Sequence, residues 1–489
     1  MLKRSAQSSL TEQLAERFAE RIRNRLLPAG ARLPSVRECA RQQGVSPYTV
    51  VAAYDQLLAQ GLVEARPQRG FFVRDAAQKM PAAPVDQVPA ALKSIVREAP
   101  GAQPQAPSGA RFNATVLIRG MFHQGSNAPQ PGSGVLPMDW LQTSFLPAAV
   151  RKVMAEGALQ DSLLGYGDPL GTPALRAALS HRLQDLGVPA SPAQVMTTVG
   201  ATQALDIVSR TLLKAGDPVM VEEPGWSVEF ARLDALGMRV LPVPRRAEGP
   251  DLEVMARYCE LHAPKLFVSV SVLHNPTGYS LAPGRAHQVL QLAQRHGFYV
   301  VEDDTYSHIA PGHATRLTVL DGLSRSIYVG GFAKILAPAW RIGYLAAPVA
   351  LMERLLDTKL LSTLTTPSLL EKALALCIEQ GQLRRHGERM RQRLAQARAR
   401  SVQLALEAGC TFAAEPGGMF GWVETGVDTD VLAQRMLDEG YLLAPGALFH
   451  ASRQPSTLMR INFSTTQDAQ FWRVFQRVRA QTLEKVQKR

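Results

Sequence analysis

Short apolar runs rich in β-branched residues alternate with helical stretches along the chain after residue 150. Strands that alternate with helices in this way form a parallel sheet whose faces the helices cover, so the pattern predicts an α/β fold. Ligands of such sheets collect at the carboxyl ends of the strands, so polar residues at those ends are the first candidates for a site. The apolar runs are DPVMVEEP, MRVLPVP, LFVSVSVL, FYVVEDD and SIYVGG.

The polar residues at or just beyond the ends of these runs are Glu223, Asn275, Asp303 and Lys334. A lysine amine condenses with an aldehyde to give an imine, and the protonated ring nitrogen of pyridoxal 5′-phosphate needs a carboxylate beside it. Asp303 and Lys334 are 31 positions apart, about the length of one crossover unit, which would bring them to neighbouring strand ends. Asp303 by itself would more often be a turn residue at the end of a strand. The combination of Asp303 with Lys334 favours a site for this cofactor.

The phosphate group of such a cofactor would need backbone amides at a helix start and a fixed cation. The stretch VGATQALDIVSRTLL is predicted to enter a helix at Ala201 and Thr202, and Arg341 follows Lys334 by seven positions. Each residue also has a simpler interpretation: Lys334 as a surface amine, Arg341 as half of a salt bridge, and Trp226 as a core side chain. Their combination is what favours a cofactor site.

The first seventy-five residues have a different pattern, that of three short helices and a hairpin. Apolar residues recur every four positions from Leu10 to Ile22, and two further helices are predicted across a three-residue turn that begins at Gly44. The stretch GLVEARPQRGFFV then gives two β-prone runs around a tip that carries Arg66 and Arg69. This is the pattern of a winged helix-turn-helix whose basic tip lies along a phosphate backbone, although a protein-docking module remains an alternative.

The charge of the chain is consistent with a polyanionic partner. The whole sequence has 54 basic and 42 acidic residues, a net charge of +12, and residues 1–75 hold 12 of the basic and 7 of the acidic ones, a net +5. The four cysteines are far apart and no histidines cluster with them, so we expect neither a metal site nor a disulfide framework. No long apolar run or signal peptide is present, which predicts a cytoplasmic protein.

Residues 30–73, GARLPSVRECARQQGVSPYTVVAAYDQLLAQGLVEARPQRGFFV, resemble the GntR family of bacterial regulators almost end to end. The resemblance implies arginines near DNA phosphates, hydroxyl residues at the start of the recognition helix and a glycine at the wing turn. The family often has arginine where this chain has Pro47, so the preferred DNA sequence is expected to differ. With the two wing arginines, the expected DNA-binding residues are Arg32, Arg37, Ser46, Thr49, Arg66, Arg69 and Gly70.

Residues from about 112 to 480 resemble the fold-type-I, aspartate-aminotransferase-like pyridoxal-phosphate enzymes through eight ordered motifs. The motifs are YGDPLGTPALRAAL, VGATQALD, EEPGW, HNPTG, VEDDTY, GGFAKILAPAWRIGY, EPGGMF and LMRINFS. The resemblance implies Lys334 as the imine lysine, Asp303 on the pyridine nitrogen and Arg460 as the clamp for a ligand carboxylate. It further implies Asn275 and Tyr306 on the ring hydroxyl, Trp226 on the ring face, Ala201, Thr202 and Arg341 on the phosphate, and Tyr166 from a partner subunit.

One departure from that family lies beside the phosphate. The family usually has a hydroxyl residue where this chain has Gly331, and another where it has Ala333. A hydrogen bond to a charged group contributes about 1.5–3 kcal/mol, so the two missing donors predict weaker, more reversible cofactor binding. Reversible binding suits a sensor better than a committed enzyme.

Four segments follow from these patterns. We expect a winged helix-turn-helix in 1–75, a flexible Pro/Ala-rich linker in 76–110, a large pyridoxal-phosphate domain in 111–345 and a small α+β domain in 346–489. A winged helix followed by an aminotransferase-like body resembles the MocR subfamily of GntR regulators.

That resemblance implies transcriptional control through operator DNA, sensing of pyridoxal phosphate or its adduct with an amino-compound effector, and a head-to-tail homodimer. Two alternatives remain: an active aminotransferase that carries a DNA-binding head, and an inert dimerisation scaffold. The intact set of Lys334, Asp303, Tyr306 and Arg341 argues against the scaffold.

Overall fold

The computed structural model describes residues 9–23, 26–66, 69–74, 130–155 and 164–487. The chain divides into two compact units, Met1–Gly125 and Ser126–Arg489. The linker expected at 76–110 lies outside the described residues, and the domain boundary expected at residue 345 stays a prediction.

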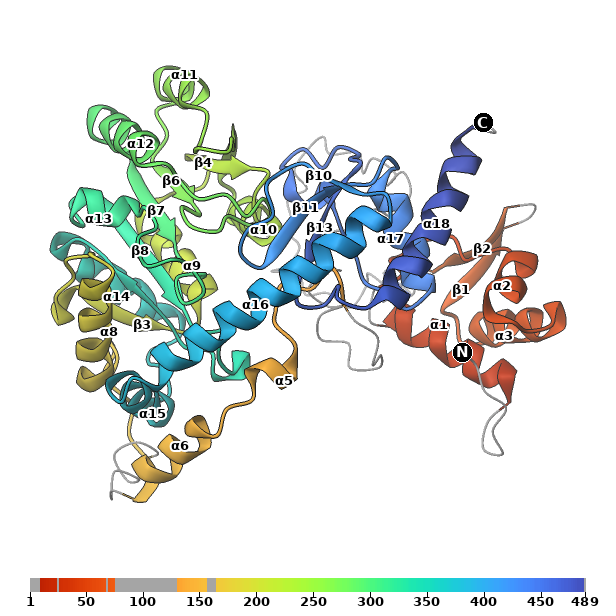
Figure 1. Ribbon diagram of the computed structural model, residues 1–489, viewed down its shortest axis with the longest axis horizontal. Coiled ribbons are helices and arrows are strands. Elements are labelled where there is room, and N and C mark those ends of the chain that lie inside the picture. The colour runs from red at the N-terminus through yellow and green to blue at the C-terminus, as the bar shows by residue number, and fades with distance from the viewer. Residues whose placement is uncertain (1–8, 24–25, 67–68, 75–129, 156–163, 488–489) are drawn as a thin grey trace, which may run out of the picture. The chain divides into compact units, whose positions relative to one another are not determined.

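The N-terminal unit is a three-helix bundle followed by a hairpin (Figure 1). Ser9 and Glu12 cap the first helix reciprocally, with backbone-to-side-chain bonds of 2.8 and 3.2 Å. Ser35 and Ser46 cap the next two helices, and Gly44 ends the second helix with a φ of +66°. The elements are α1 (Leu10–Arg23), α2 (Val36–Gln43), α3 (Pro47–Ala59), β1 (Val63–Arg66) and β2 (Gly70–Val73).

The core of this unit joins all three helices to the hairpin. Leu14 and Phe18 of α1 pack with Tyr54 of α3, whose ring meets Phe18 edge-on at 5.6 Å and Phe71 at 5.0 Å. The Tyr54 hydroxyl donates to the carbonyl of Pro34 at 2.9 Å, so this fully buried polar group is satisfied. The winged helix-turn-helix predicted from sequence is confirmed.

The second unit is built on a seven-stranded sheet in the order β3-β9-β8-β7-β6-β4-β5 (Figure 1). The five strands predicted from the apolar runs are all parallel, whereas β9 is antiparallel to both of its neighbours. The carboxyl ends of β4, β6, β7 and β8 therefore share one edge. The strands are β3 (Val195–Thr198), β4 (Pro218–Glu223), β5 (Arg239–Pro244), β6 (Leu266–Ser269), β7 (Tyr299–Asp303), β8 (Ser326–Gly331) and β9 (Gly343–Ala346).

Helices cover both faces of this sheet, because alternate side chains of each buried strand point in opposite directions. Val219, Val221 and Val301 belong to one apolar cluster, which includes residues of α9, α10 and α14. Met220 and Val300 belong to the other, with residues of α11, α12 and α13. These helices are α9 (Ala201–Leu212), α10 (Ser227–Ala235), α11 (Leu252–His262), α12 (Pro283–His296), α13 (Leu317–Asp321) and α14 (Val349–Ser362).

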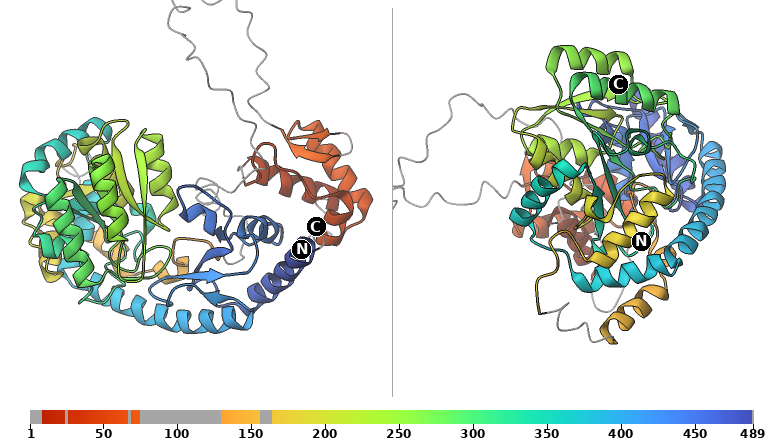
Figure 2. Two further views of the ribbon diagram at one scale, coloured as in Figure 1. Left: turned by 90° about the horizontal axis from the view of Figure 1, so that it is seen from above. Right: turned by 90° about the vertical axis from the view of Figure 1, so that its left-hand side faces the viewer.

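A small antiparallel sheet lies beside the large one, in the order β10-β11-β13-β12. The long helix α16 (Gln382–Glu407) runs from α15, which packs against α6 and α8, to this small sheet (Figure 2). None of the described helices is long and apolar enough to cross a membrane. The remaining elements are α5 (Met138–Leu141), α6 (Phe145–Ala155), α8 (Pro173–Asp185), α15 (Ser368–Glu379), β10 (Thr411–Phe412), β11 (Phe420–Glu424), α17 (Thr429–Asp438), β12 (Ala444–Pro445), β13 (Leu458–Asn462) and α18 (Ala469–Gln487).

Candidate cofactor and effector site

Lys334 follows the end of β8 by three residues and is partly buried. Its amine donates to the carbonyl of Gly134 at 2.7 Å and lies 5.9 Å from the centre of the Tyr306 ring. Exclusion of water from around the amine, followed by the positive charge of Arg460, lowers the pKa of Lys334 to about 8. A neutral amine, which is the nucleophilic form, is therefore accessible near physiological pH.

Asp303 is the last residue of β7, the neighbour of β8. Its Oδ1 accepts hydrogen bonds from both the backbone N–H, at 3.1 Å, and the hydroxyl of Thr305. Burial raises the pKa of Asp303 to about 6, although the Thr305 bonds oppose the rise. A cationic partner would hold this carboxylate in its ionised form.

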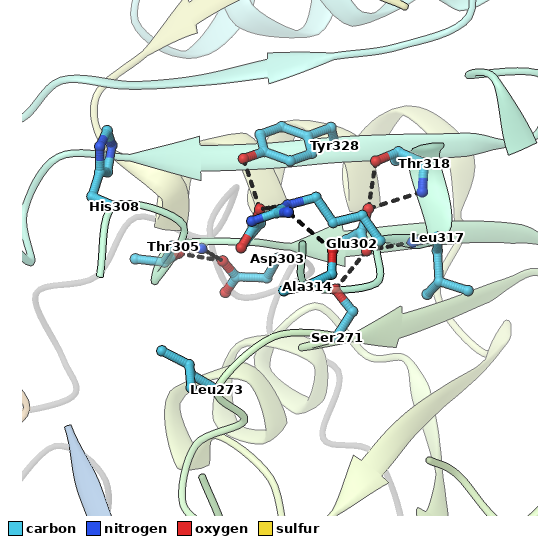
Figure 3. A network of polar contacts seen from close by, with 12 residues as sticks. Ser271, Leu273, Glu302, Asp303, Thr305, His308, Ala314, Leu317, Thr318 and Tyr328 are labelled. Carbon is cyan, nitrogen blue, oxygen red and sulfur yellow. Dashed lines mark hydrogen bonds and ion pairs between the residues drawn. The ribbon is translucent and has the colours of Figure 1, made fainter. Parts of the chain in front are cut away.

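The two carboxylates on either side of Asp303 anchor the end of β7 (Figure 3). Glu302 accepts from the hydroxyls of Ser271 and Thr318 and from two backbone N–H groups at the start of α13. Asp304 accepts from Arg316 Nε at 2.6 Å and from the Tyr328 hydroxyl at 3.0 Å. Because adjacent strand residues point to opposite faces, these bonds fix the strand and so fix the direction of Asp303.

Arg460 lies in the middle of β13, on the small sheet. Its guanidinium donates to Asn275 Oδ1 at 2.9 Å and to the carbonyl of Gly132 at 2.6 Å, and it stacks 4.4 Å from the centre of the Phe420 ring. Its Nε is buried and has no hydrogen-bond partner among the described residues. The side chain therefore retains a donor for a carboxylate, and removing water from around it lowers the pKa of Arg460 to about 10.

One short segment, residues 130–135, contacts both of these cationic side chains. The Gly132 carbonyl binds Arg460 and the Gly134 carbonyl binds Lys334. Asn462, also on β13, donates to the carbonyls of Ser133 at 3.0 Å and Val135 at 2.8 Å. We call residues 130–135 the strap, because they connect a side chain of the small sheet with one of the large sheet.

The predicted phosphate end of the site lies at the start of α9. Arg341, with a φ of +50°, donates to the carbonyl of Val199 at 3.2 Å. Gly200 has a φ of +80°, which favours glycine, and a Cβ there would lie 2.5 Å from Arg341 Nη2. A Cβ on Gly331 would lie 3.6 Å from the amide nitrogen of Ala201.

This arrangement fits the phosphate of pyridoxal phosphate. Helix amides, a guanidinium and three bare glycine positions, including Gly343, surround the start of α9. Thr202 is exposed in the first turn and Ala201 is partly exposed.

Of the other residues predicted to contact the cofactor, some lie close to Arg460 and others do not. Tyr306 and Asn275 are buried beside Arg460, and Asn275 bonds with Tyr306 as well as with Arg460. Trp226 caps α10 and is only partly buried against the core. Tyr166 is 85% exposed.

The predicted DNA-binding residues lie on the surface of the N-terminal unit. Arg37 and Arg69 are exposed, whereas Arg66 is partly engaged, with a 2.8 Å bond to Glu64 and its guanidinium 4.5 Å from the centre of the Phe72 ring.

The recognition-helix hydroxyls and the wing glycine also have defined positions. Ser46 caps α3 and its hydroxyl lies 2.9 Å from that of Thr49. Arg32 lies over Gly70, whose φ is +97°, with its Nε 3.5 Å from where a Cβ would stand.

Sequence reasoning missed the strap and the anchor of β7. Gly132 and Gly134 act through their backbone carbonyls, which every residue type has, so the sequence does not mark them. The glycine-rich stretch PGSG, before the first described helix of this unit, is the available indication of a special backbone segment. Arg316 and Asp304 are 12 positions apart and meet only because α13 packs on β7.

Comparison with known proteins assigns each of the two units to a protein family. Residues 10–73 match the family model of bacterial regulatory proteins, gntR family, and residues 132–478 match that of aminotransferase class I and II. The HTH-type transcriptional regulator YdcR of Escherichia coli is 29% identical over 92% of this chain and 94% of its own. The probable rhizopine catabolism regulatory protein MocR of Rhizobium meliloti is 32% identical over 80% of this chain and 76% of its own.

A solved structure of similar fold contains the cofactor. The kynurenine aminotransferase of Pyrococcus horikoshii, in complex with PMP, has a TM-score of 0.67 and 26% identity over 74% of this chain and 92% of its own. The cofactor of this fold and family is pyridoxal 5′-phosphate, and the N-terminal unit is of a DNA-binding type. The chain belongs to the aminotransferase class I and II family over most of its length and, with its GntR-type head, to the MocR subfamily of GntR transcriptional regulators.

Proposed function

We propose that this protein is a transcriptional regulator that binds operator DNA through residues 10–73 and senses pyridoxal phosphate, or its adduct with an amino compound, through residues 132–478. The observation that carries the proposal is the strap. The same short segment binds the amine of Lys334 and the guanidinium of Arg460. In sequence, this segment follows the residues that connect it with the DNA-binding unit.

Each end of the site has a role in this proposal. Pyridoxal phosphate, when bound, supplies an aldehyde that can exchange between amines. Lys334 would hold the cofactor covalently, the Asp303 carboxylate would pair with its ring nitrogen, and Arg341 with the α9 amides would hold its phosphate. Tyr306 and Asn275 would orient the ring through its hydroxyl, and Trp226 would cover one face.

Binding is coupled to the strap because its carbonyls compete for the same donors. An effector carboxylate that binds the free Nε of Arg460 and also reaches Nη2 would displace the neutral carbonyl of Gly132, because a charged acceptor makes a stronger hydrogen bond. A Lys334 amine that held the cofactor would no longer donate to the Gly134 carbonyl. Either change would release one contact of the strap, and a coupling free energy of about 1–3 kcal/mol is enough to change DNA occupancy several-fold.

We further propose a homodimer in which Tyr166 reaches the phosphate of the partner subunit. The support is exposure: Tyr166 is 85% exposed, and Leu164 and Leu361, at 83% and 92%, are also apolar and exposed. A 2.5 Å bond from Lys359 Nζ to the Pro169 carbonyl joins the segment after Tyr166 to α14, which carries Leu361. Large apolar side chains exposed in one region of a protein mark an interface.

A second candidate function, transamination, is favoured by the neutral amine accessible at Lys334 and by the paired Arg460 and Asn275. To distinguish transamination from sensing, a mixture of amino acids is added and conversion of the bound cofactor to its amine form is measured. Fast single-turnover conversion supports an enzyme, whereas slow conversion with altered DNA binding supports a regulator.

The experiment that tests the regulator is DNA binding by the full-length protein, measured by fluorescence anisotropy on a duplex from its own upstream region. We expect pyridoxal phosphate, alone or with amino acids, to change the Kd by about 5–150-fold. Lys334→Ala should abolish this response, while Lys214→Ala, at an exposed lysine, should leave it intact. An unchanged Kd in the wild type contradicts sensing, and a monomer in sedimentation of the same samples contradicts the dimer.

A further inference from the structure

The recognition helix α3 exposes large apolar side chains at its N-terminal end. Tyr48 is 82% exposed and Val51, three residues later on the same side, is 41% exposed. The other large apolar residues of the first three turns, Val50, Tyr54 and Leu57, are fully buried in the core of the unit. Tyr48 and the exposed part of Val51 are therefore available to a partner.

The same part of the helix lacks the side chains that usually read bases. From Gly44 to Tyr54 the sequence is GVSPYTVVAAY, with no arginine, lysine, asparagine or glutamine. Neither the bidentate arginine contact to guanine nor the bidentate amide contact to adenine can be made from the first two turns of α3. The exposed cations of the unit lie on other elements, with Arg37 and Arg41 on α2 and Arg69 in the wing.

The hydroxyl groups of Ser46 and Thr49 already have local partners. Ser46 Oγ accepts the backbone N–H of Thr49 at 3.1 Å and lies 2.9 Å from Thr49 Oγ1. Both hydroxyls are thus engaged in capping the helix. What α3 presents beyond them is the ring of Tyr48 and the two methyl groups of Val51.

Among the four bases, thymine alone offers an apolar group, its C5 methyl, in the major groove. We propose that Tyr48 and Val51 determine DNA sequence specificity by contacting thymine methyl groups, while arginines on α2 and in the wing hold the phosphates. This inference rests on the proposed DNA-binding function and names what the head recognises. The partner is duplex DNA whose half-sites carry thymine under the first two turns of α3.

A protein partner for Tyr48 and Val51 is disfavoured by the charge around them. Residues 1–75 hold 12 basic and 7 acidic residues, and Arg37, Arg41 and Arg69 are exposed. Apolar side chains among exposed arginines match a groove in which methyl groups lie between two phosphate backbones.

The test removes single methyl groups from the DNA. Duplexes bound by the full-length protein are selected from a random pool, and each thymine of the selected half-site is then replaced by deoxyuridine, which keeps the O4 acceptor. One lost methyl contact should weaken binding roughly fourfold, since a buried methylene contributes about 0.8 kcal/mol. The dependence of Kd on salt should not change, because no phosphate contact is lost.

Variants assign the effect to residues. Val51→Ala and Tyr48→Ala should each bind the thymine duplex more weakly and lose sensitivity to one of the deoxyuridine replacements, whereas Tyr48→Phe should keep it. Val431→Ala, which shortens a valine of equal 41% exposure in the other unit, should match the wild type.

Three outcomes overturn the inference in distinguishable ways. Sequence-specific binding that is indifferent to deoxyuridine rejects methyl readout and leaves the DNA-binding function standing. Deoxyuridine sensitivity that persists in both alanine variants assigns the methyl contact to other residues. Failure to bind any duplex at low salt overturns the proposed function and the inference together.

Discussion

Gly331 shows how much a single bare position can set the strength of cofactor binding. It lies at the end of β8, and its φ is not in the left-handed region, so a side chain would cause no backbone strain there. A Cβ at this position would stand in ordinary contact with Ala201, at 3.6 Å from its nitrogen. Glycine is therefore not required by the fold at this position, and its effect is to omit a donor beside the start of α9.

Gly331→Ser should tighten the binding of pyridoxal phosphate. A hydrogen bond donated by a hydroxyl group to a charged phosphate contributes about 1.5–3 kcal/mol, which corresponds to a Kd lower by roughly 10- to 160-fold in an absorbance titration. Gly331→Ala adds the Cβ without the donor and is expected to match the wild type. A serine variant that binds no better than the alanine variant would show that the hydroxyl does not reach the phosphate.

At the scale of residues, the sequence predicts positions correctly where a motif specifies a particular type of side chain. Lys334 and Asp303 were predicted at neighbouring strand ends, and the structure puts them just beyond β8 and at the end of β7. The strap could not be predicted, since Gly132 and Gly134 contribute backbone carbonyls. The 85% exposure of Tyr166 likewise depends on tertiary structure.

Among the elements, β7 is the one on which the site depends most. Its end carries three consecutive carboxylates, of which the outer two are buried and bonded to α13, to β8 and to Arg316 (Figure 3). The ion pair between Arg316 and Asp304 has both side chains at most 1% exposed. Removing one member of such a pair leaves an uncompensated buried charge.

Arg316→Met should lower the free energy of unfolding by about 3–5 kcal/mol, measured by urea denaturation of the cofactor-free protein. Arg246→Met is the matched control, because Arg246 is 70% exposed and its pair with Asp251 is 3.4 Å long, so its stability should stay close to wild type. Equal stability of the two variants would mean that the buried pair does not hold the end of β7.

Element-level prediction succeeded for the five parallel strands, because each is a continuous apolar run. It missed β3 and β9, which read VMTT and GYLA. β6 is just as short, but it lies within the longer apolar run LFVSVSVL. The antiparallel pairing of β3 with β9 joins segments that are distant in sequence, which no local pattern indicates.

For the whole molecule, the central claim is that cofactor binding in one unit and DNA binding in the other are coupled. Coupling of this kind is reciprocal: the factor by which pyridoxal phosphate changes DNA affinity must equal the factor by which DNA changes pyridoxal phosphate affinity. Reciprocity does not depend on how the two units are arranged, so it tests the claim without assuming a geometry.

The most direct measurement is an absorbance titration of the full-length protein with pyridoxal phosphate, performed free and on saturating operator DNA. The account predicts that the two dissociation constants differ, by the same factor found when DNA affinity is measured with and without the cofactor. Identical titration curves would contradict it, because the site around Lys334 would then be thermodynamically independent of the DNA-binding head.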